Sequence, residues 1–294
     1  MLIDFVGLGS MGLGMAVSLV NAGHTVRGFD PAVTRVEMLI AQGGTAFGDA
    51  APKADAVVSA VLNADQTRAV LFGERGVAKR LRPGGVIISC ATVSPAFAAE
   101  MEAQAADMSL LYLDAPISGG AIKAAAGQLS IMAAGTVEAF GVADPALEAM
   151  AETVHHLGDH AGPGSAMKAV NQLLAGVHIA AMGEALAFGA SQGLTPAQVV
   201  QVVSVSAGTS WMFENRAPHV VDGDYTPRSK VDIWLKDLGI VTDIAASAAL
   251  PVPISSNALA QFRAASEAGL GDEDDAAIAK YFARAGGVTL PGDN

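Results

Sequence analysis

Three glycines near the amino terminus constrain this chain more than any other feature. Gly7, Gly9 and Gly12 follow directly on an apolar run at 2–6. The first permits a tight turn, the second lets a bound group approach the backbone, and the third lets the next helix pack against the strand. A strand, such a turn and a helix in this order are typical of the phosphate-binding turn of a doubly wound α/β domain. The alternative is a glycine turn in some other kind of α/β protein.

An acidic residue ends the second apolar run, at 25–29. A carboxylate in this position accepts hydrogen bonds from the adenosine ribose and repels a 2′-phosphate, which favours NAD over NADP. The predicted NAD-binding residues are therefore Gly7, Leu8, Gly9, Ser10, Met11, Gly12 and Asp30. Arg35 follows on the next helical pattern; it is interpreted as a solvated helix residue, with contact to a phosphate as the alternative.

Short apolar segments alternate with helix-compatible stretches through the first half of the chain. This pattern predicts a mainly parallel sheet with helices on both faces. The predicted strands are 2–6, 25–29, 56–61, 86–90, 110–113, 129–133 and 153–157.

The pattern changes after Gly164. The stretch 165–192 has no proline and little charge, and predicts a helix of about 40 Å, too long to connect two neighbouring strands. Gly193 is expected to end this helix, and no convincing strand follows it. The sequence thus predicts an NAD-binding Rossmann domain over 1–163 and an all-helical domain over 164–294, joined by the long helix, for substrate binding and oligomerisation.

Composition limits the environment and the partners of the chain. The formal net charge is −12, which disfavours binding to the phosphate backbone of a nucleic acid. The single cysteine excludes an internal disulfide. The start of the chain lacks the features of a signal peptide, and no long uninterrupted apolar run predicts a membrane span. A soluble cytoplasmic protein is expected, with neither a nucleic acid nor a membrane as partner.

A second glycine loop follows the predicted strand 110–113. Ser118, Gly119 and Gly120 offer a hydroxyl group and successive backbone N–H groups, an arrangement that suits a carboxylate. The alternative is a plain loop with a glycine hinge.

The long apolar helix carries a polar patch near its start. Asn171 and Gln172 follow Lys168 at spacings that place all three on one helix face. Burial favours the neutral form of a lysine, which can then serve as a general acid or base. The alternative is a lysine that extends to solvent from a helix end.

Four segments together resemble the β-hydroxyacid dehydrogenase family: GLGSMGLGMAVSLVNAGHTV, DAPISGG, GPGSAMKAVNQLL and KDLGIV, in matching order along almost the whole chain. The resemblance implies that Lys168 exchanges a proton with the substrate hydroxyl. It further implies that the 118–120 loop holds the substrate carboxylate and that Asn171 orients the substrate. A homodimer or homotetramer is also implied.

The resemblance adds cofactor contacts outside the glycine turn. Thr92 and Lys236 match cofactor-contacting positions, and Leu62 and Asn63 are expected to line the nicotinamide side. The chain departs from the family at two places. Many relatives have a second asparagine where this chain has Gln172, which is expected to bind the substrate together with Asn171. A proline often follows the leucine that matches Leu62.

Segments such as NQLLAGVHIAAMGEAL, SWMFENR and GDEDDAAI narrow the resemblance to members that oxidise the 2-hydroxyl of a four-carbon sugar acid with NAD. The alternatives within the enzyme class are 3-hydroxyisobutyrate, tartronate semialdehyde and glyoxylate as substrates. The alternative of another class is a non-catalytic NAD-binding regulator. Lys168 beside two amides argues against it, because a binding protein needs no buried proton donor.

The remaining candidate residues are expected to have structural roles rather than catalytic or metal-binding ones. His155, His156 and His160 lie close together, but no cysteine or acid pair completes a recognisable metal site, and no metal is expected. Cys90 is expected to pack at a strand end. The cluster 211–213 is expected to pack in the core, with a wall of the substrate pocket as the alternative.

Overall fold

The computed structural model describes residues 1–48 and 52–293. The chain divides into two compact units, Met1–Lys168 and Ala169–Asn294, and each has its own hydrophobic core.

The first unit is built on a six-stranded sheet in the order β3-β2-β1-β4-β5-β6, in which every pair of neighbours is parallel. Its strands are β1 (Leu2–Val6), β2 (Thr25–Phe29), β3 (Thr45–Ala46), β4 (Ala54–Ser59), β5 (Leu81–Ser89) and β6 (Leu111–Asp114). The strand order reverses between β1 and β4, and ligands of such sheets bind outside the carboxyl ends of the strands at this point. The doubly wound fold predicted from the sequence is confirmed.

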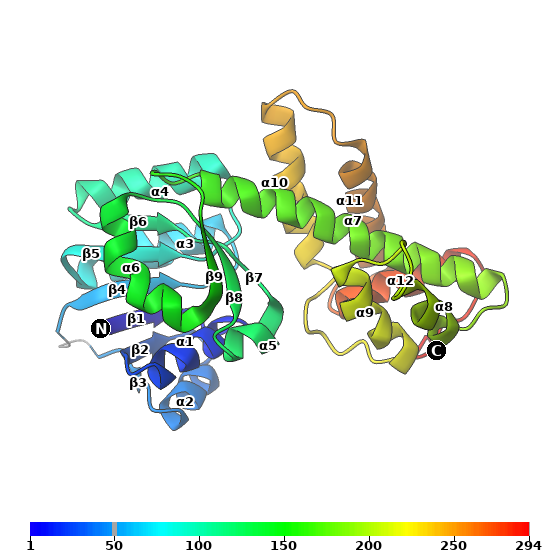
Figure 1. Cartoon of the computed structure of the whole chain (residues 1–294), viewed down its shortest axis with the longest axis horizontal. Helices are drawn as coiled ribbons and strands as arrows, with labels where there is room; N and C mark the ends of the chain where they lie inside the picture. Colours follow the sequence, from blue (N-terminus) through cyan, green and yellow to red (C-terminus); the bar gives the residue numbers. More distant parts are fainter. Residues whose placement is uncertain (49–51, 294) are drawn as a thin grey trace. The chain divides into compact units, whose positions relative to one another are not determined.

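Helices cover both faces of this sheet (Figure 1). They are α1 (Gly12–Asn21), α2 (Val33–Ala41), α3 (Ala64–Phe72), α4 (Pro95–Asp107) and α6 (Val137–Met150), with a short 3₁₀ turn η1 (Val77–Arg80). Val58 of β4 packs in the cluster under α1, α2 and α6, whereas its neighbour Val57 packs in the cluster that contains residues of α3 and α4. Because successive residues of a strand point to opposite faces, an almost continuous apolar strand can fill both layers.

A second, three-stranded sheet lies beside the first in the same unit. It contains β7 (Ile117–Ser118), β8 (Leu129–Ala133) and β9 (Ala151–His156), with β7 antiparallel and β9 parallel to β8. The short helix α5 (Gly120–Ala125) connects β7 to β8. The placement of 129–133 and 153–157 in one sheet with the other strands is therefore wrong. An apolar pattern identifies a strand but does not specify the neighbour with which it pairs.

The second unit is helical throughout its described residues, apart from turns and loops. Its long helices are α7 (Pro163–Ser191), which starts in the first unit, α8 (Pro196–Val203), α9 (Trp211–Asp222), α10 (Ile233–Ser247), α11 (Pro253–Ala265) and α12 (Ile278–Ala285). Shorter helical turns are η2 (Ser266–Leu270) and η3 (Asp275–Ala277). The long helix predicted at 165–192 is confirmed, and Gly193 follows it with a φ of +79°.

Two glycines let other helices approach α7 closely. A Cβ at Gly176 would lie 2.9 Å from atoms of Leu238 and Trp234 on α10, and a Cβ at Gly183 would lie 2.8 Å from Ile278 on α12. Among the described helices, α7 alone is long and apolar enough to cross a membrane, but half of its most apolar window is buried, as in a core helix of a globular domain. Gly176 and Gly183 allow α10 and α12 to pack closely against α7 and so bury part of it.

The start of α7 is held by a side chain from the sheet. Asp114, at the end of β6, accepts hydrogen bonds from the backbone N–H groups of Gly162 (2.9 Å) and Ser165 (2.8 Å) and from the Ser165 hydroxyl (2.7 Å). The first N–H groups of a helix have no partner within the helix, and a carboxylate there also interacts favourably with the helix dipole. Burial raises the pKa of Asp114 despite these three bonds.

We expect Asp114→Ala to lower the free energy of unfolding by about 2 to 4 kcal/mol, because it leaves buried donors without an acceptor. Urea denaturation followed by circular dichroism measures the loss. The control is Asp107→Ala, an exposed acid at the end of α4. A loss no larger than that of the control would contradict the capping role.

Candidate functional site

The glycine turn has the backbone geometry that a dinucleotide requires. Gly7 has a φ of +90°, and a Cβ at Gly12 would lie 1.9 Å from the carbonyl oxygen of Gly7. A Cβ at Gly9 would meet nothing within 4 Å. Packing thus requires glycine at the first and third positions, whereas the second leaves open space above the backbone, where phosphate groups can approach it.

The Asp30 side chain stabilises this turn through hydrogen bonds to two backbone N–H groups. One carboxylate oxygen accepts a hydrogen bond of 2.8 Å from the N–H of Leu8, and the other accepts one of 2.9 Å from the N–H of Ala32. Each oxygen can accept a further bond, so the same carboxylate can hold the turn and receive ribose hydroxyl groups.

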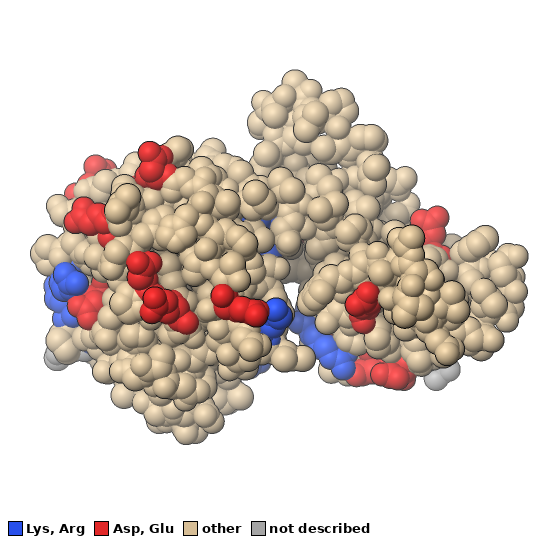
Figure 2. Space-filling model, in the orientation of Figure 1, with Lys and Arg blue, Asp and Glu red and all other residues tan. Residues whose placement is uncertain are grey.

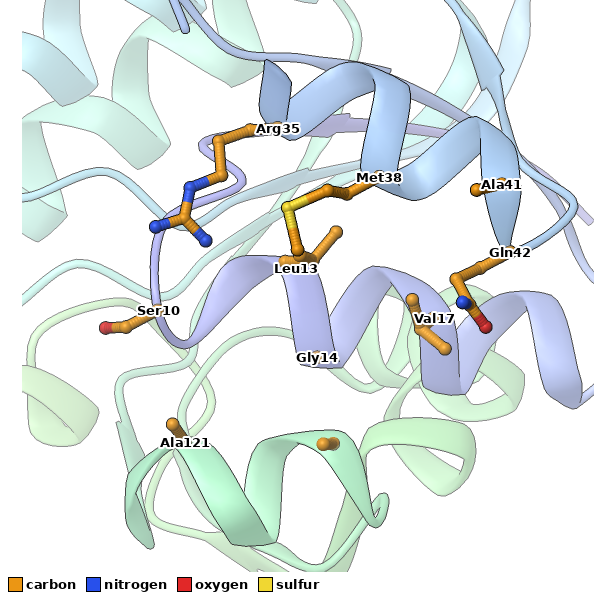
Figure 3. Close-up of a pocket in the computed structure, with 10 residues that line it drawn as sticks. Ser10, Leu13, Gly14, Val17, Arg35, Met38, Ala41, Gln42 and Ala121 are labelled. Atoms are coloured by element: carbon orange, nitrogen blue, oxygen red, sulfur yellow. The ribbon is translucent and has the colours of Figure 1, made fainter. Parts of the chain in front are cut away.

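A hollow of about 420 Å³ lies beside the turn, between α1, α2 and α5 (Figure 3). Its lining is mainly apolar and consists of Ser10, Leu13, Gly14, Val17, Arg35, Met38, Ala41, Gln42, Ala121 and Ala125. Figure 3 shows the guanidinium group of Arg35 extending from α2 toward the turn that carries Ser10. Arg35 is half-buried rather than fully solvated, and it places a positive charge next to the phosphate-binding turn.

The loops after β4 and β5 contain the other cofactor candidates of the first unit. Leu62 is 51% exposed, and Thr92 is half-buried. The Asn63 side chain caps α3 by accepting a 2.9 Å hydrogen bond from the N–H of Gln66. Because the carboxyl ends of parallel strands meet at one edge of a sheet, these loops lie on the same edge as the glycine turn.

The 118–120 loop is shaped by two glycines in conformations that other residues rarely adopt. Gly119 has a φ of +141° and Gly120 a φ of +78°. Ser118 is half-buried at the end of the edge strand β7, opposite Ser130. A Cβ at Gly120 would meet nothing within 4 Å, so the backbone there is open to a ligand.

Lys168, Asn171 and Gln172 lie near the start of α7, at helical spacings that share a face. Lys168 and Gln172 are each 8% exposed, and Asn171 is half-buried. A lysine with so little exposed surface, close to two amides, is a candidate for proton transfer.

The two amides belong to a hydrogen-bonded chain that ends on α10. Asn171 donates from Nδ2 to Oε1 of Gln172 (2.9 Å), and Gln172 donates from Nε2 to the carboxylate of Asp237 (2.5 Å). The other oxygen of Asp237 lies 2.7 Å from Nζ of Lys236. Gln172 thus connects Asn171 to a carboxylate that is 4% exposed.

Asp237 is the residue that sequence reasoning missed. Asp237 follows Lys236 within the segment KDLGIV, and this position is the one feature of the sequence that could have indicated its role. Its partner Gln172 is distant along the chain, and spacing alone does not reveal such a pair.

The structure agrees with some of the structural roles expected from the sequence and differs from others. Cys90 is buried after β5 as predicted, and burial raises its pKa to about 12, so the thiol stays protonated. Phe213 packs in the core at 4% exposure, but Trp211 is 56% exposed. Within residues 1–48 and 52–293, no group of three or more His, Cys, Asp or Glu side chains is placed to hold a metal ion.

Two family models match consecutive parts of the chain. Residues 2–158 match the NAD-binding domain of 6-phosphogluconate dehydrogenase. Residues 162–282 match the NAD-binding domain of NADP-dependent 3-hydroxyisobutyrate dehydrogenase.

Known proteins resemble the chain over nearly its whole length. An L-threonate dehydrogenase of Pectobacterium atrosepticum is 49% identical, covering 98% of this chain and 95% of that protein. A crystal structure of 3-hydroxyisobutyrate dehydrogenase from Salmonella typhimurium is 47% identical with a TM-score of 0.91, covering 96% of this chain and 99% of the other. A Mycobacterium tuberculosis 3-hydroxyisobutyrate dehydrogenase with L-serine is 32% identical with a TM-score of 0.82, covering 95% and 98%.

The chain is thus highly identical to known dehydrogenases over nearly its whole length. It also has the fold and the glycine turn expected of an oxidoreductase that uses a nicotinamide cofactor. The chain therefore belongs to the β-hydroxyacid dehydrogenase family and is an NAD-dependent dehydrogenase.

Proposed function

We propose that this enzyme oxidises the 2-hydroxyl group of L-threonate to give 2-dehydro-L-erythronate. The observation that carries the proposal is the 49% identity to a protein named L-threonate dehydrogenase over 98% of this chain. The alternative substrates are 3-hydroxyisobutyrate, which is favoured by the name of the Salmonella protein, and tartronate semialdehyde or glyoxylate.

In this proposal Lys168 is the general base. Its neutral amine accepts the proton of the substrate hydroxyl, while the hydrogen on the same carbon leaves as hydride and the carbon–oxygen bond becomes a carbonyl. NAD, when bound, supplies the acceptor for the hydride. In the reverse direction the charged lysine protonates the developing alkoxide. The low exposure of Lys168 and its place on one face of α7 with Asn171 and Gln172 support this role.

The substrate carboxylate is held by the 118–120 loop, through the Ser118 hydroxyl and the backbone of Gly119 and Gly120. The open backbone at Gly120 supports this assignment. The Oδ1 atom of Asn171 accepts a hydrogen bond from a substrate hydroxyl, and Gln172 positions Asn171 rather than contacting the substrate.

The glycine turn and Asp30 hold the adenosine and pyrophosphate of NAD, and the carboxylate of Asp30 favours NAD over NADP. The nicotinamide half is contacted by Leu62, Asn63, Thr92 and Lys236.

Residues 1–163 form the NAD-binding domain, and residues 164–294 form the domain for substrate binding and oligomerisation. The enzyme acts in the cytoplasm as a homodimer or homotetramer, with neither nucleic acid nor membrane as a partner.

A panel of hydroxy acids tests the substrate. The purified enzyme is assayed with NAD and with NADP, and formation of reduced cofactor is followed by its absorbance. We expect the highest kcat/KM with L-threonate and NAD, and a lower value with D-threonate and 3-hydroxyisobutyrate. Higher kcat/KM with 3-hydroxyisobutyrate would reassign the substrate. Inactivity on every acid, with NAD still bound, would favour the non-catalytic regulator.

Lys168→Ala tests the general base. We expect kcat to fall by about 100- to 10,000-fold, the usual contribution of a positioned proton-transfer group, while the affinity for NAD stays within about twofold. Lys79→Ala, a substitution of an exposed lysine in the first unit, is the control and should keep full activity. Activity of Lys168→Ala equal to that of the control would exclude the role.

Asp237→Asn tests the chain of amides. The neutral amide weakens the bond from Gln172 and the ion pair with Lys236, so Asn171 is held less firmly. We expect KM to rise about 10-fold or more, with little change in secondary structure. Asp272→Asn removes an exposed ion pair with Lys230 in the same unit and is the matched control. Unchanged KM in Asp237→Asn would mean that the network does not position the substrate.

A further inference from the structure

Helices α1 and α5 lie directly against each other in the first unit. A Cβ at Gly14 of α1 would lie 2.7 Å from the backbone nitrogen of Ala125 and 3.0 Å from the carbonyl carbon of Ala124, both on α5. Figure 3 shows Gly14 on the side of α1 that faces the helix of Ala121. Because backbone meets backbone here without a side chain between them, neither helix has room to move toward the other.

A buried hydroxyl group joins the same two helices one turn further along α1. Ser18 is 7% exposed, and its Oγ atom lies 3.1 Å from the carbonyl oxygen of Ala124 and 3.4 Å from that of Ala125. Carbonyl groups in the last turn of a helix lack partners within that helix. Ser18 thus donates from α1 to a group at the end of α5 that needs a donor.

The other end of α5 carries the 118–120 loop. Gly119 directly precedes α5, and a Cβ on it would lie 3.1 Å from the side chains of Leu129 and Lys123. Ala124 is four residues beyond Gly120, which is about 6 Å along a helix axis. The loop and the turn of α5 that Ser18 holds therefore belong to one short segment with little freedom to bend.

Helix α1 in turn begins at the glycine turn. Gly12 is the first residue of α1, and Ser18 follows six residues later, about 9 Å along the axis. The turn assigned to the cofactor phosphates and the loop assigned to the substrate carboxylate are thus the starting points of two helices in direct contact.

We propose that Ser18, together with Gly14, sets the distance between the glycine turn and the 118–120 loop, and hence between the nicotinamide ring and the reacting carbon of the substrate. This inference rests on the proposed function, because it takes the 118–120 loop as the carboxylate site. Reacting atoms must approach within about 3 to 3.5 Å, and a misplacement of about 1 Å can lower the rate about 100-fold. Ser18 is a positioning residue, since it acts through α5 and not by contact with the reacting atoms.

A second side-chain attachment of α5 is an ion pair at the surface. Nζ of Lys123 lies 3.3 Å from Oε2 of Glu152 on β9, and both side chains are exposed. Figure 2 shows side chains of both charges at the surface where Figure 1 draws α5. Exposed pairs contribute little, because water and salt screen them. The buried contact with α1 therefore holds α5 more firmly than this pair does.

Ser18→Ala tests the proposal, and the fold should tolerate it because the substitution removes one hydroxyl group and adds no atoms. The variant is assayed in single turnovers with the acid that gives the highest kcat/KM, and reduced cofactor is followed by its absorbance. We expect hydride transfer to slow by about 10- to 100-fold, while KM for the acid and the Kd of NAD measured by calorimetry stay within about twofold. Substrate deuterated at the reacting carbon should slow the variant further, which identifies hydride transfer as the affected step.

Glu152→Gln is the matched control, because it removes the exposed ion pair of α5 and should keep the wild-type rate of hydride transfer. A second variant, Gly14→Ala, pushes α5 away from α1 and should slow hydride transfer as Ser18→Ala does. Its own control is Gly141→Ala on α6, where a Cβ would meet nothing within 4 Å and the rate should not change.

A wild-type rate of hydride transfer in Ser18→Ala would overturn the role of Ser18, whatever Gly14→Ala shows. A slower rate that Glu152→Gln reproduces, or that comes with an equal loss of NAD affinity, would also overturn it, since the disturbance would then be general. Ser118→Ala separates these results from a failure of the proposed function. A raised KM in Ser118→Ala, with no effect of Ser18→Ala, would keep the carboxylate site and reject the positioning role. An unchanged KM in Ser118→Ala would remove the carboxylate site and the positioning role with it.

Discussion

The bonds from Asp114 to the start of α7 are the connection on which the candidate site depends. The carboxylate stands at the end of β6 and accepts from Gly162 and Ser165, one turn before Lys168. Whatever fixes β6 in the sheet therefore also fixes the first turn of α7. Dehydrating a carboxylate is unfavourable, and here three donors offset part of that cost. A polar group buried in this way defines one geometry far more sharply than apolar packing does.

A second buried carboxylate, Asp237, orients side chains of α7 in the second unit. It accepts from Gln172 and pairs with Lys236, so a residue of α10 determines how the amides of α7 point. Charges buried in this way add little net stability, since the cost of removing them from water offsets their attraction. Their value lies in orientation. An amide whose donor side is already engaged presents its oxygen in one direction.

The local parts of this structure could be predicted from the sequence. The glycine turn, Asp30 and the parallel strands follow from spacing and apolar pattern, and α7 follows from a long stretch without proline. The second sheet was not predicted, because β8 and β9 have the same apolar pattern as the strands of the first sheet. Asp114 and Asp237 were not predicted to hold α7 and Gln172, since these bonds join residues far apart in sequence. The sequence predicts that Gln172 binds the substrate, but it does not reveal the hydrogen bond from Gln172 to Asp237.

The glycine turn has one further consequence, which concerns the kinetics of cofactor binding. Asp30 already bonds to Leu8 and Ala32, so the turn is closed by the chain's own hydrogen bonds. A loop ordered in advance loses little conformational entropy when a ligand arrives. Association then needs no slow rearrangement of the turn, and the rate at which the cofactor exchanges is set by how fast it leaves.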